Sequence, residues 1–174
     1  MKARFLWRAF KARYRDEIAE LSAIKEFVRP GDTVCDIGAN KGGFVWWMSR
    51  WVGTEGRVIA FEPQQELADY LHRVCRELPL SNVTVEAKAI AAETETRTLY
   101  VPGESGNSPG ASLNAALLER ESCRTVEVSV VALDDYFPAH CPVSVLKIDV
   151  EGAEKKVFEG ARRILAQQSP LLVF

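Results

Sequence analysis

The sequence predicts an α/β domain built on a doubly wound parallel sheet. Short β-branched runs alternate along the chain with stretches of helical periodicity, a pattern that places helices on both faces of a parallel sheet. A turn of small residues joins the first run to the helical stretch that follows it. The 174 residues, 47% apolar and 26% charged, suffice for one sizeable core. We therefore expect one domain over residues 30–174, preceded by a helical segment over residues 1–29.

The first 29 residues predict an amphipathic helical cap. Apolar side chains recur every three or four residues between Leu6 and Val28, which favours one helix or two. Residues 1–15 hold six Lys or Arg and no acid. The stripe is expected to pack on the sheet, and a basic membrane-surface anchor or a transit segment is the alternative.

Five core strands and three helices are predicted after the cap. The predicted strands cover residues 33–37, 57–61, 83–87, 145–150 and 171–174, and the predicted helices cover residues 44–51, 65–77 and 153–167. Two further β-rich segments, 97–101 and 125–132, indicate a peripheral antiparallel pair. The polar stretch 102–114 is expected to be a lid over an acceptor or a plain surface loop.

The turns after the first, second and fourth strands carry acidic residues. In such a sheet a ligand binds outside the carboxyl ends of the strands, where the strand order reverses. The four acids in these turns are Asp36, Glu62, Asp149 and Glu151. The sequence therefore places a candidate site at this edge of the sheet.

The first turn reads DIGANKGGF over residues 36–44. Glycines let a ligand approach the backbone, and the start of a helix exposes unpaired N–H donors for an anionic group. Asp36 would repel a phosphate at close range, so the ligand should also carry a cation. S-adenosylmethionine fits, because its ammonium can meet Asp36, its carboxylate the N–H groups of residues 39–43, and its ribose Glu62. Glu62 follows Gly38 by 24 positions, near the offset of about 20 typical of a ribose-binding acid, although a helix-capping carboxylate is an alternative.

The fourth strand supplies two candidate catalytic residues, Lys147 and Asp149. Period-two alternation places both on one face of a buried strand, so Lys147 needs a partner, for which Asp36 and Asp149 are candidates. S-adenosylmethionine is a methyl donor, and methyl transfer needs an in-line approach of the acceptor atom, with a base where that atom must lose a proton. Asp149 is the candidate base, and a capping or cofactor-binding carboxylate is the alternative.

Three motifs resemble the FkbM family of S-adenosylmethionine-dependent methyltransferases: DIGANKGGF from Asp36, FEP from Phe61 and LKIDVEGAE from Leu146. The resemblance implies a class I, Rossmann-like methyltransferase fold and O-methylation of a hydroxyl on a small molecule, sugar or lipid-like acceptor. It further implies a set of cofactor-binding residues, with Lys88 to Ile90 on the adenine side. The set is Asp36, Gly38, Ala39, Asn40, Gly42, Gly43, Phe44, Glu62, Pro63, Ala89 and Ile90. Against the seven strands of that fold, the chain is expected to be truncated in the fifth strand, leaving an edge at residues 171–174 that could self-associate.

Composition excludes several classes of partner. The net charge of −2 gives no overall field for nucleic acid. The four cysteines show no CxxC spacing, so neither a zinc site nor a redox site is expected. No apolar run reaches the roughly 18 to 20 residues of a membrane span, which favours a cytoplasmic protein without stable membrane insertion.

Three other functions stay open at this point. An NAD-dependent enzyme of the same fold class is disfavoured by Asp36 and by the absence of GxGxxG. A non-catalytic domain with a degenerate cofactor pocket is the second, and a divalent metal held by the four acids is the third.

Overall fold

Five parallel strands form the central sheet of the computed structural model, which describes residues 1–103, 110–114 and 123–174. The strand order is β3-β2-β1-β7-β8, and every pairing in it is parallel. The strands are β1 (Thr33–Ile37), β2 (Arg57–Phe61), β3 (Val83–Glu86), β7 (Val145–Ile148) and β8 (Leu171–Val173). The order reverses at β1, because β2 and β3 extend to one side of it while β7 and β8 lie on the other. The predicted doubly wound α/β fold is confirmed.

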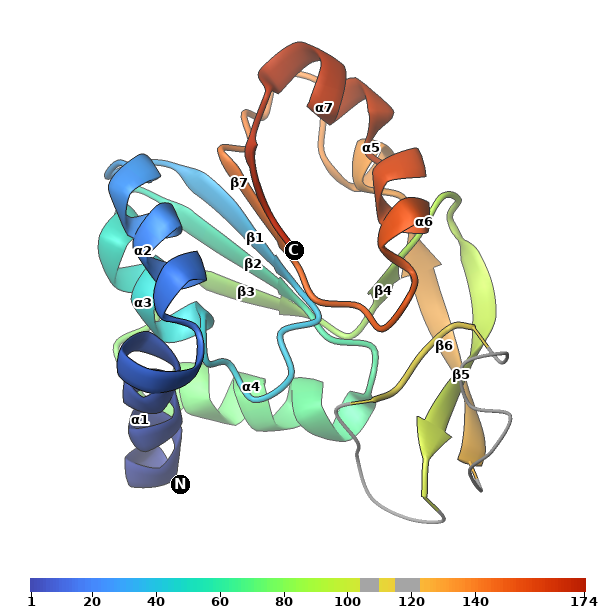
Figure 1. The fold of residues 1–174 in the computed structure, drawn as a ribbon, viewed down its shortest axis with the longest axis horizontal. Coiled ribbons are helices and arrows are strands. Elements are labelled where there is room, and N and C mark those ends of the chain that lie inside the picture. The colour runs from blue at the N-terminus through green and yellow to red at the C-terminus, as the bar shows by residue number, and fades with distance from the viewer. Residues whose placement is uncertain (104–109, 115–122) are drawn as a thin grey trace.

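Helices cover both faces of this sheet (Figure 1). Side chains of β1 alternate between the two faces, as in any β-strand: Val34 packs against the helices on one face, and Cys35 and Ile37 pack against those on the other. The first layer holds α2 (Ile18–Phe27), α3 (Val45–Val52) and α4 (Gln65–Glu77); the second holds α5 (Leu133–Tyr136), α6 (Glu154–Glu159) and α7 (Arg162–Gln168). Burial on both faces explains why the strands are continuous apolar runs.

The N-terminal residues form helices that pack on the first layer. α1 (Lys2–Lys11) continues into a π-helical turn, η1 (Ala12–Asp16), and the chain leaves helical geometry at Glu17 before α2 begins. Phe5 and Ala9 form the buried face of α1. A helix of this segment therefore rests on α3 and α4, next to the turn that follows β1. In the part of the chain that the structure describes, no helix is both long and apolar enough to cross a bilayer.

A smaller sheet stands beside the central one, with the order β4-β6-β5. Its strands are β4 (Ala89–Ile90), β5 (Glu95–Pro102) and β6 (Cys123–Val131). β5 and β6 are antiparallel, which confirms the predicted peripheral pair. β4 pairs in parallel with β6, and this two-residue strand is too short to give a period in the sequence.

The prediction of one helix over residues 153–167 is wrong, because the segment forms α6 and α7 with a break at Gly160. A side chain at Gly160 would collide with the backbone carbonyl of Ala91. The Gly160 carbonyl also accepts a hydrogen bond of 2.9 Å from the N–H of Asp134. The helix is thus interrupted by tertiary contacts that no local pattern encodes.

Candidate functional site

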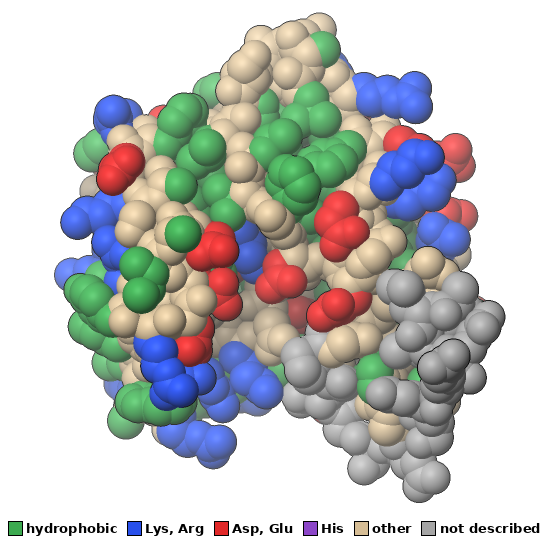
Figure 2. All heavy atoms as spheres, viewed as in Figure 1, with side chains coloured by type: hydrophobic (Ala, Val, Ile, Leu, Met, Phe, Trp, Pro, Cys, Tyr) green, Lys and Arg blue, Asp and Glu red, His purple; other side chains and the backbone are tan. Residues whose placement is uncertain are grey.

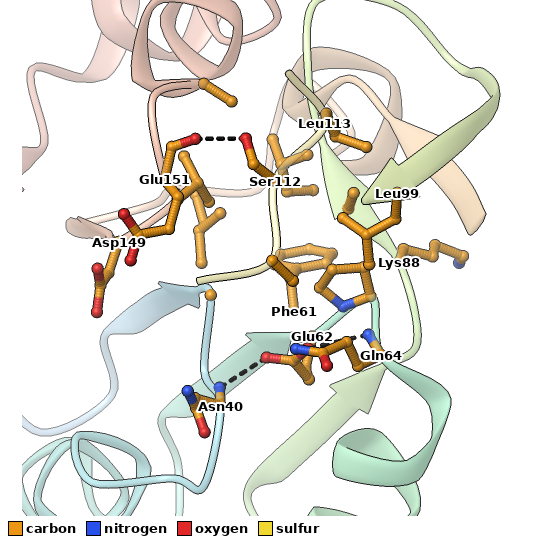
Figure 3. Close-up of a pocket in the computed structure, with 18 residues that line it drawn as sticks. Asn40, Phe61, Glu62, Gln64, Lys88, Leu99, Ser112, Leu113, Asp149 and Glu151 are labelled. Atoms are coloured by element: carbon orange, nitrogen blue, oxygen red, sulfur yellow. Dashed lines mark hydrogen bonds between the residues drawn. The ribbon is translucent and has the colours of Figure 1, made fainter. Parts of the chain in front are cut away.

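A pocket lies at the carboxyl ends of β1, β2 and β7, where the strand order reverses (Figure 3). It encloses about 750 Å³ including its open mouth. Seven of the predicted cofactor-binding or catalytic residues line it: Gly38, Asn40, Glu62, Pro63, Ala89, Ile90 and Asp149. The structure therefore brings residues from four separate segments to one cavity, as the position of the strand ends predicts.

The turn after β1 is held tightly against its neighbours. The N–H groups of Gly38 and Ala39 both donate to the carbonyl of Phe61 at 3.0 Å, which joins the turn to the end of β2. Gly38 has φ +81°, and a side chain there would collide with the backbone carbonyl of Asp149. Only glycine suits this position, because the turn after β1 passes directly against the backbone that follows β7.

Glu62 fastens the end of β2 to the same turn. Its Oε2 accepts a hydrogen bond of 2.8 Å from the N–H of Asn40, and its Oε1 accepts one of 2.9 Å from the N–H of Gln64 at the start of α4 (Figure 3). Burial raises the pKa of Glu62, and these two hydrogen bonds partly offset that rise. Glu62 is thus both a pocket-lining acid and a carboxylate that caps α4.

Lys147 joins the two acids Asp36 and Asp149. Its Nζ lies 3.2 Å from Oδ1 of Asp36 and 3.3 Å from Oδ2 of Asp149. The Asp36 and Lys147 side chains are only 1% and 6% exposed, whereas that of Asp149 is 69% exposed. Burial alone would lower the pKa of Lys147, but the two carboxylates raise it, so the ammonium stays charged. The predicted pairing of Lys147 is confirmed with both partners.

Asp36 is not among the residues that line the pocket. Ile37 and Gly38 line it, but Asp36 points to the opposite face of the sheet, where Lys147 lies over the ring of Phe44 at 4.6 Å. Burial raises the pKa of Asp36, and Lys147 opposes that rise. Glu62 thus lines the pocket and Asp36 does not, and their joint contact with one ligand stays a prediction.

Five other predicted residues are likewise not among those that line the pocket: Ala39, Gly42, Gly43, Phe44 and Lys147. Ala39 and Phe44 are buried. Gly42 has φ +76° and packs so closely under Phe5 and Leu71 that a side chain would come within 2.8 Å of each. Gly42 and Gly43 thus lie where Phe5 of α1 and Ala12 of η1 pack on the turn.

The smaller sheet and the loop before β6 supply part of the wall that sequence reasoning missed. Leu99, Ser112 and Leu113 line the pocket opposite the strand ends. Ser112 Oγ donates a hydrogen bond of 2.6 Å to the carbonyl of Glu151, so this loop is tied to the turn after β7 (Figure 3). Residues 110–114 belong to the predicted lid, and residues 104–109 of that lid lie outside the described part of the chain. No spacing in the sequence signals Ser112, because its contact spans 39 positions.

A polar cluster closes the side of the pocket near β3. Lys88 Nζ lies 2.6 Å from Oε2 of Glu86, and the hydroxyl of Tyr136 donates to Oε1 of Glu86 at 3.0 Å. Burial and the neighbouring Glu86 raise the pKa of Tyr136. Lys88 also lines the pocket, so the segment predicted for the adenine side is present there.

Among residues 1–103, 110–114 and 123–174, no group of three or more His, Cys, Asp or Glu is placed to hold a metal ion. The four acids of the strand-end turns do not form such a group. The arrangement gives no support to a metal held by them.

A parallel α/β sheet with a pocket at its switch point defines the Rossmann-like class of ligand-binding domains. The profile of the Methyltransferase FkbM domain family matches residues 36–174. This chain belongs to the FkbM methyltransferase family.

Solved structures show the same fold. An FkbM methyltransferase from Methylobacillus flagellatus KT is similar with a TM-score of 0.57 and 19% identity, over 98% of this chain and 43% of that one. A putative rRNA methylase from Clostridium thermocellum is similar with a TM-score of 0.50 and 19% identity, over 88% of this chain and 60% of that one. The chain thus spans about two fifths to three fifths of the length of these two structures. A comparison with curated protein sequences finds no match.

Proposed function

We propose that this chain binds S-adenosylmethionine in the strand-end pocket and transfers its methyl group to a hydroxyl of a small molecule, sugar or lipid-like acceptor. One observation carries the proposal: a buried carboxylate, Glu62, and an exposed one, Asp149, line the same cavity at the switch point of the sheet. Membership of the FkbM family supports the reaction class.

The chemistry of the pocket fits the cofactor. The Glu62 carboxylate accepts two backbone hydrogen bonds and one from the side chain of Gln64, so of its roughly four acceptor positions one is left for a ribose hydroxyl. Phe61, Ile90 and Leu99 provide an apolar wall suited to adenine. The direct contact predicted between Asp36 and the ammonium of the ligand stays a prediction, and the pocket lining does not support it.

Asp149 is the proposed base. When bound, S-adenosylmethionine supplies an electrophilic methyl group on its sulfonium. Asp149 lies at the pocket with an exposed carboxylate, where it could accept the proton of the acceptor hydroxyl as the oxygen forms its bond to the methyl carbon and the carbon–sulfur bond breaks. Lys147 is a positioning residue, because it holds Oδ2 of Asp149 at 3.3 Å and is itself anchored by Asp36.

Two measurements test this function. Calorimetry should show binding of S-adenosylmethionine and of its demethylated product, but not of NAD. Mass spectrometry of a metabolite extract incubated with protein and cofactor should then reveal a species heavier by one methylene unit. Binding without any methylated product would favour a non-catalytic cofactor-binding domain, and binding of NAD alone would refute the proposal.

A further inference from the structure

The outward face of the N-terminal helices is unusually rich in exposed large apolar side chains. Seven such residues occur among those described, and all except Phe174 lie within residues 1–27. The six are Met1, Trp7, Phe10, Tyr14, Ile18 and Phe27. Trp7 and Tyr14 are 62% and 65% exposed, although both are large enough to contribute to a core. The fold does not account for them.

α1 and η1 carry two apolar stripes on opposite sides. Phe5, Ala9 and Ala12 follow one another at intervals of four and three residues and are buried against the domain. Trp7, Phe10 and Tyr14 follow at intervals of three and four, and they lie on the other side. The first stripe is buried when the helix docks, whereas the second remains about half or more exposed and is available to a partner.

The exposed stripe continues into the aromatic residues of α3. The ring centroids of Phe10 and Trp47 are 5.1 Å apart, those of Tyr14 and Trp47 are 6.0 Å apart, and Trp47 stacks on Trp51 at 6.0 Å. Trp47 Nε1 also donates a hydrogen bond of 2.7 Å to the carbonyl of Ala9. The aromatic surface is therefore held by two packed helices rather than by one fraying end.

Positive charge surrounds this aromatic surface. Residues 1–15 contain six Lys or Arg and no acid, while the rest of the chain contains 16 basic and 24 acidic residues. Arg4, Arg8, Lys41 and Arg73 line one surface hollow between α1 and α4, with Glu66 as the acid among its lining residues. Figure 2 shows Lys and Arg grouped with apolar side chains over α1, whereas acidic side chains gather in the middle of the same view.

Some of these cations already have partners. Lys11 and Arg15 pair with Asp16 at 2.8 and 3.6 Å, and Arg8 donates to the hydroxyl of Tyr70 at 3.2 Å. Lys2 and Arg4 are exposed and form no ion pair within the described part of the chain. A net positive surface therefore remains.

We propose that this face, defined by Trp7, Phe10, Tyr14 and the surrounding cations, binds the surface of an anionic phospholipid membrane. Aromatic rings favour the headgroup level of a bilayer, and Lys or Arg beside them attract anionic lipids. The hollow lined by Arg4 and its basic neighbours is suited to lipid phosphates. A second copy of the chain fits poorly, because a symmetric contact would bring the same cations together.

Sedimentation with lipid vesicles tests this proposal on the full chain. The protein should bind vesicles containing phosphatidylglycerol, should not bind vesicles of phosphatidylcholine alone, and should be released by high salt. All four tryptophans lie in α1 or α3, so their emission should shift to shorter wavelength on binding.

Matched variants distinguish the contribution of positive charge to membrane binding from that of the aromatic side chains. Arg4→Glu should weaken the partition roughly tenfold or more, whereas Lys155→Glu on exposed α6 makes the same charge change and should leave it unchanged. Trp7→Ser with Phe10→Ser should abolish binding, whereas Phe174→Ser removes a ring that is more exposed than either and should not. Circular dichroism and cofactor affinity should be unaltered in all four variants, since none contacts the strand-end pocket.

Four results would overturn the proposal. Equal binding to neutral and anionic vesicles would show that lipid charge does not matter. Wild-type binding by both α1 variants would show that neither Arg4 nor the two aromatic rings contribute. No vesicle binding together with a dimer that the α1 variants dissolve would assign this face to a second copy. Salt-sensitive binding of single-stranded RNA without vesicle binding would assign it to nucleic acid.

Discussion

The carboxylate of Glu62 has both a structural role and a place in the candidate binding site. It holds Asn40 in the turn after β1 and Gln64 at the start of α4, and it also faces the pocket. Because burial raises its pKa above the ordinary 4.5, it takes up a proton at a higher pH than an exposed glutamate. A protonated Glu62 loses acceptor capacity toward both backbone and ligand.

The affinity for S-adenosylmethionine should therefore fall as the pH is lowered toward the raised pKa of Glu62. Glu62→Gln should bind more weakly by roughly tenfold, about 1.4 kcal/mol, and should lose this pH dependence, because no proton is exchanged at residue 62. Calorimetry across a pH series checks both effects. A Glu62→Gln variant that keeps the wild-type pH profile would assign the titration to another group.

Lys147 balances a carboxylate that has no access to water. Lys147→Met should destabilise the fold by about 3 kcal/mol, since it leaves Asp36 buried without a countercharge. The double variant Asp36→Asn with Lys147→Met should recover much of that loss, and Lys156→Met on the surface should change little. Urea unfolding measures all three, and equal destabilisation by the single and double variants would show that the ion pair is not the cause.

Substitutions at Gly38 and Gly31 distinguish the cost of a positive φ from the cost of a steric clash. Alanine at either Gly31 or Gly38 would adopt positive φ, which costs about 1 to 2 kcal/mol. Only at Gly38 does the new methyl group meet a backbone carbonyl, that of Asp149, while at Gly31 nothing lies within 4 Å. Gly38→Ala should thus lose cofactor binding and more stability than Gly31→Ala, as unfolding curves and calorimetry can establish. Equal losses of stability and of cofactor binding in the two variants would mean that the ends of β1 and β7 can move apart to accept the methyl group.

At the scale of elements, Phe5 is the one fully buried aromatic residue through which α1 packs on the domain. Phe5 is fully buried, contacts Trp46 edge to face at 6.3 Å and lies over Gly42. Phe5→Ala should cost about 3 kcal/mol or release α1 locally, whereas Phe10→Ala, half-exposed on the other side, should cost less than about 1 kcal/mol. Hydrogen exchange of the α1 amides distinguishes local release from global destabilisation. Unchanged protection in Phe5→Ala would contradict this docking.

Elements with a strong local pattern could be predicted from the sequence, and those set by tertiary contact could not. The five core strands are apolar on both faces, so their positions were recognisable, with ends displaced by at most two residues. The break at Gly160 depends on Ala91, and β4 depends on β6, both distant along the chain. The alternation of side chains along β7 correctly predicted that Lys147 is buried. In β1 the same alternation places Asp36 on the face opposite Ile37, which lines the pocket. The place of Ser112 in the pocket wall was not predicted, because the polar loop that contains it has no periodic pattern of apolar residues.

At the scale of the whole molecule, the candidate site and the basic surface are distinct. The strand-end pocket opens between the central sheet and the smaller sheet, whereas the aromatic and basic side chains lie over α1 and α3 (Figures 1 and 2). α1 nevertheless contacts the turn after β1 through Phe5 and Gly42. A membrane-bound α1 would therefore hold the cofactor turn close to the lipid surface, which suits the lipid-like acceptors among those proposed.

Titration of the chain with S-adenosylmethionine in a calorimeter tests the central claim most directly. We expect one molecule bound per chain, with weaker binding to the Glu62→Gln variant and unchanged binding to the Arg4→Glu variant. Absence of binding by a folded wild-type chain, or equal binding by the Glu62→Gln variant, would contradict the assignment of the strand-end pocket as the cofactor site.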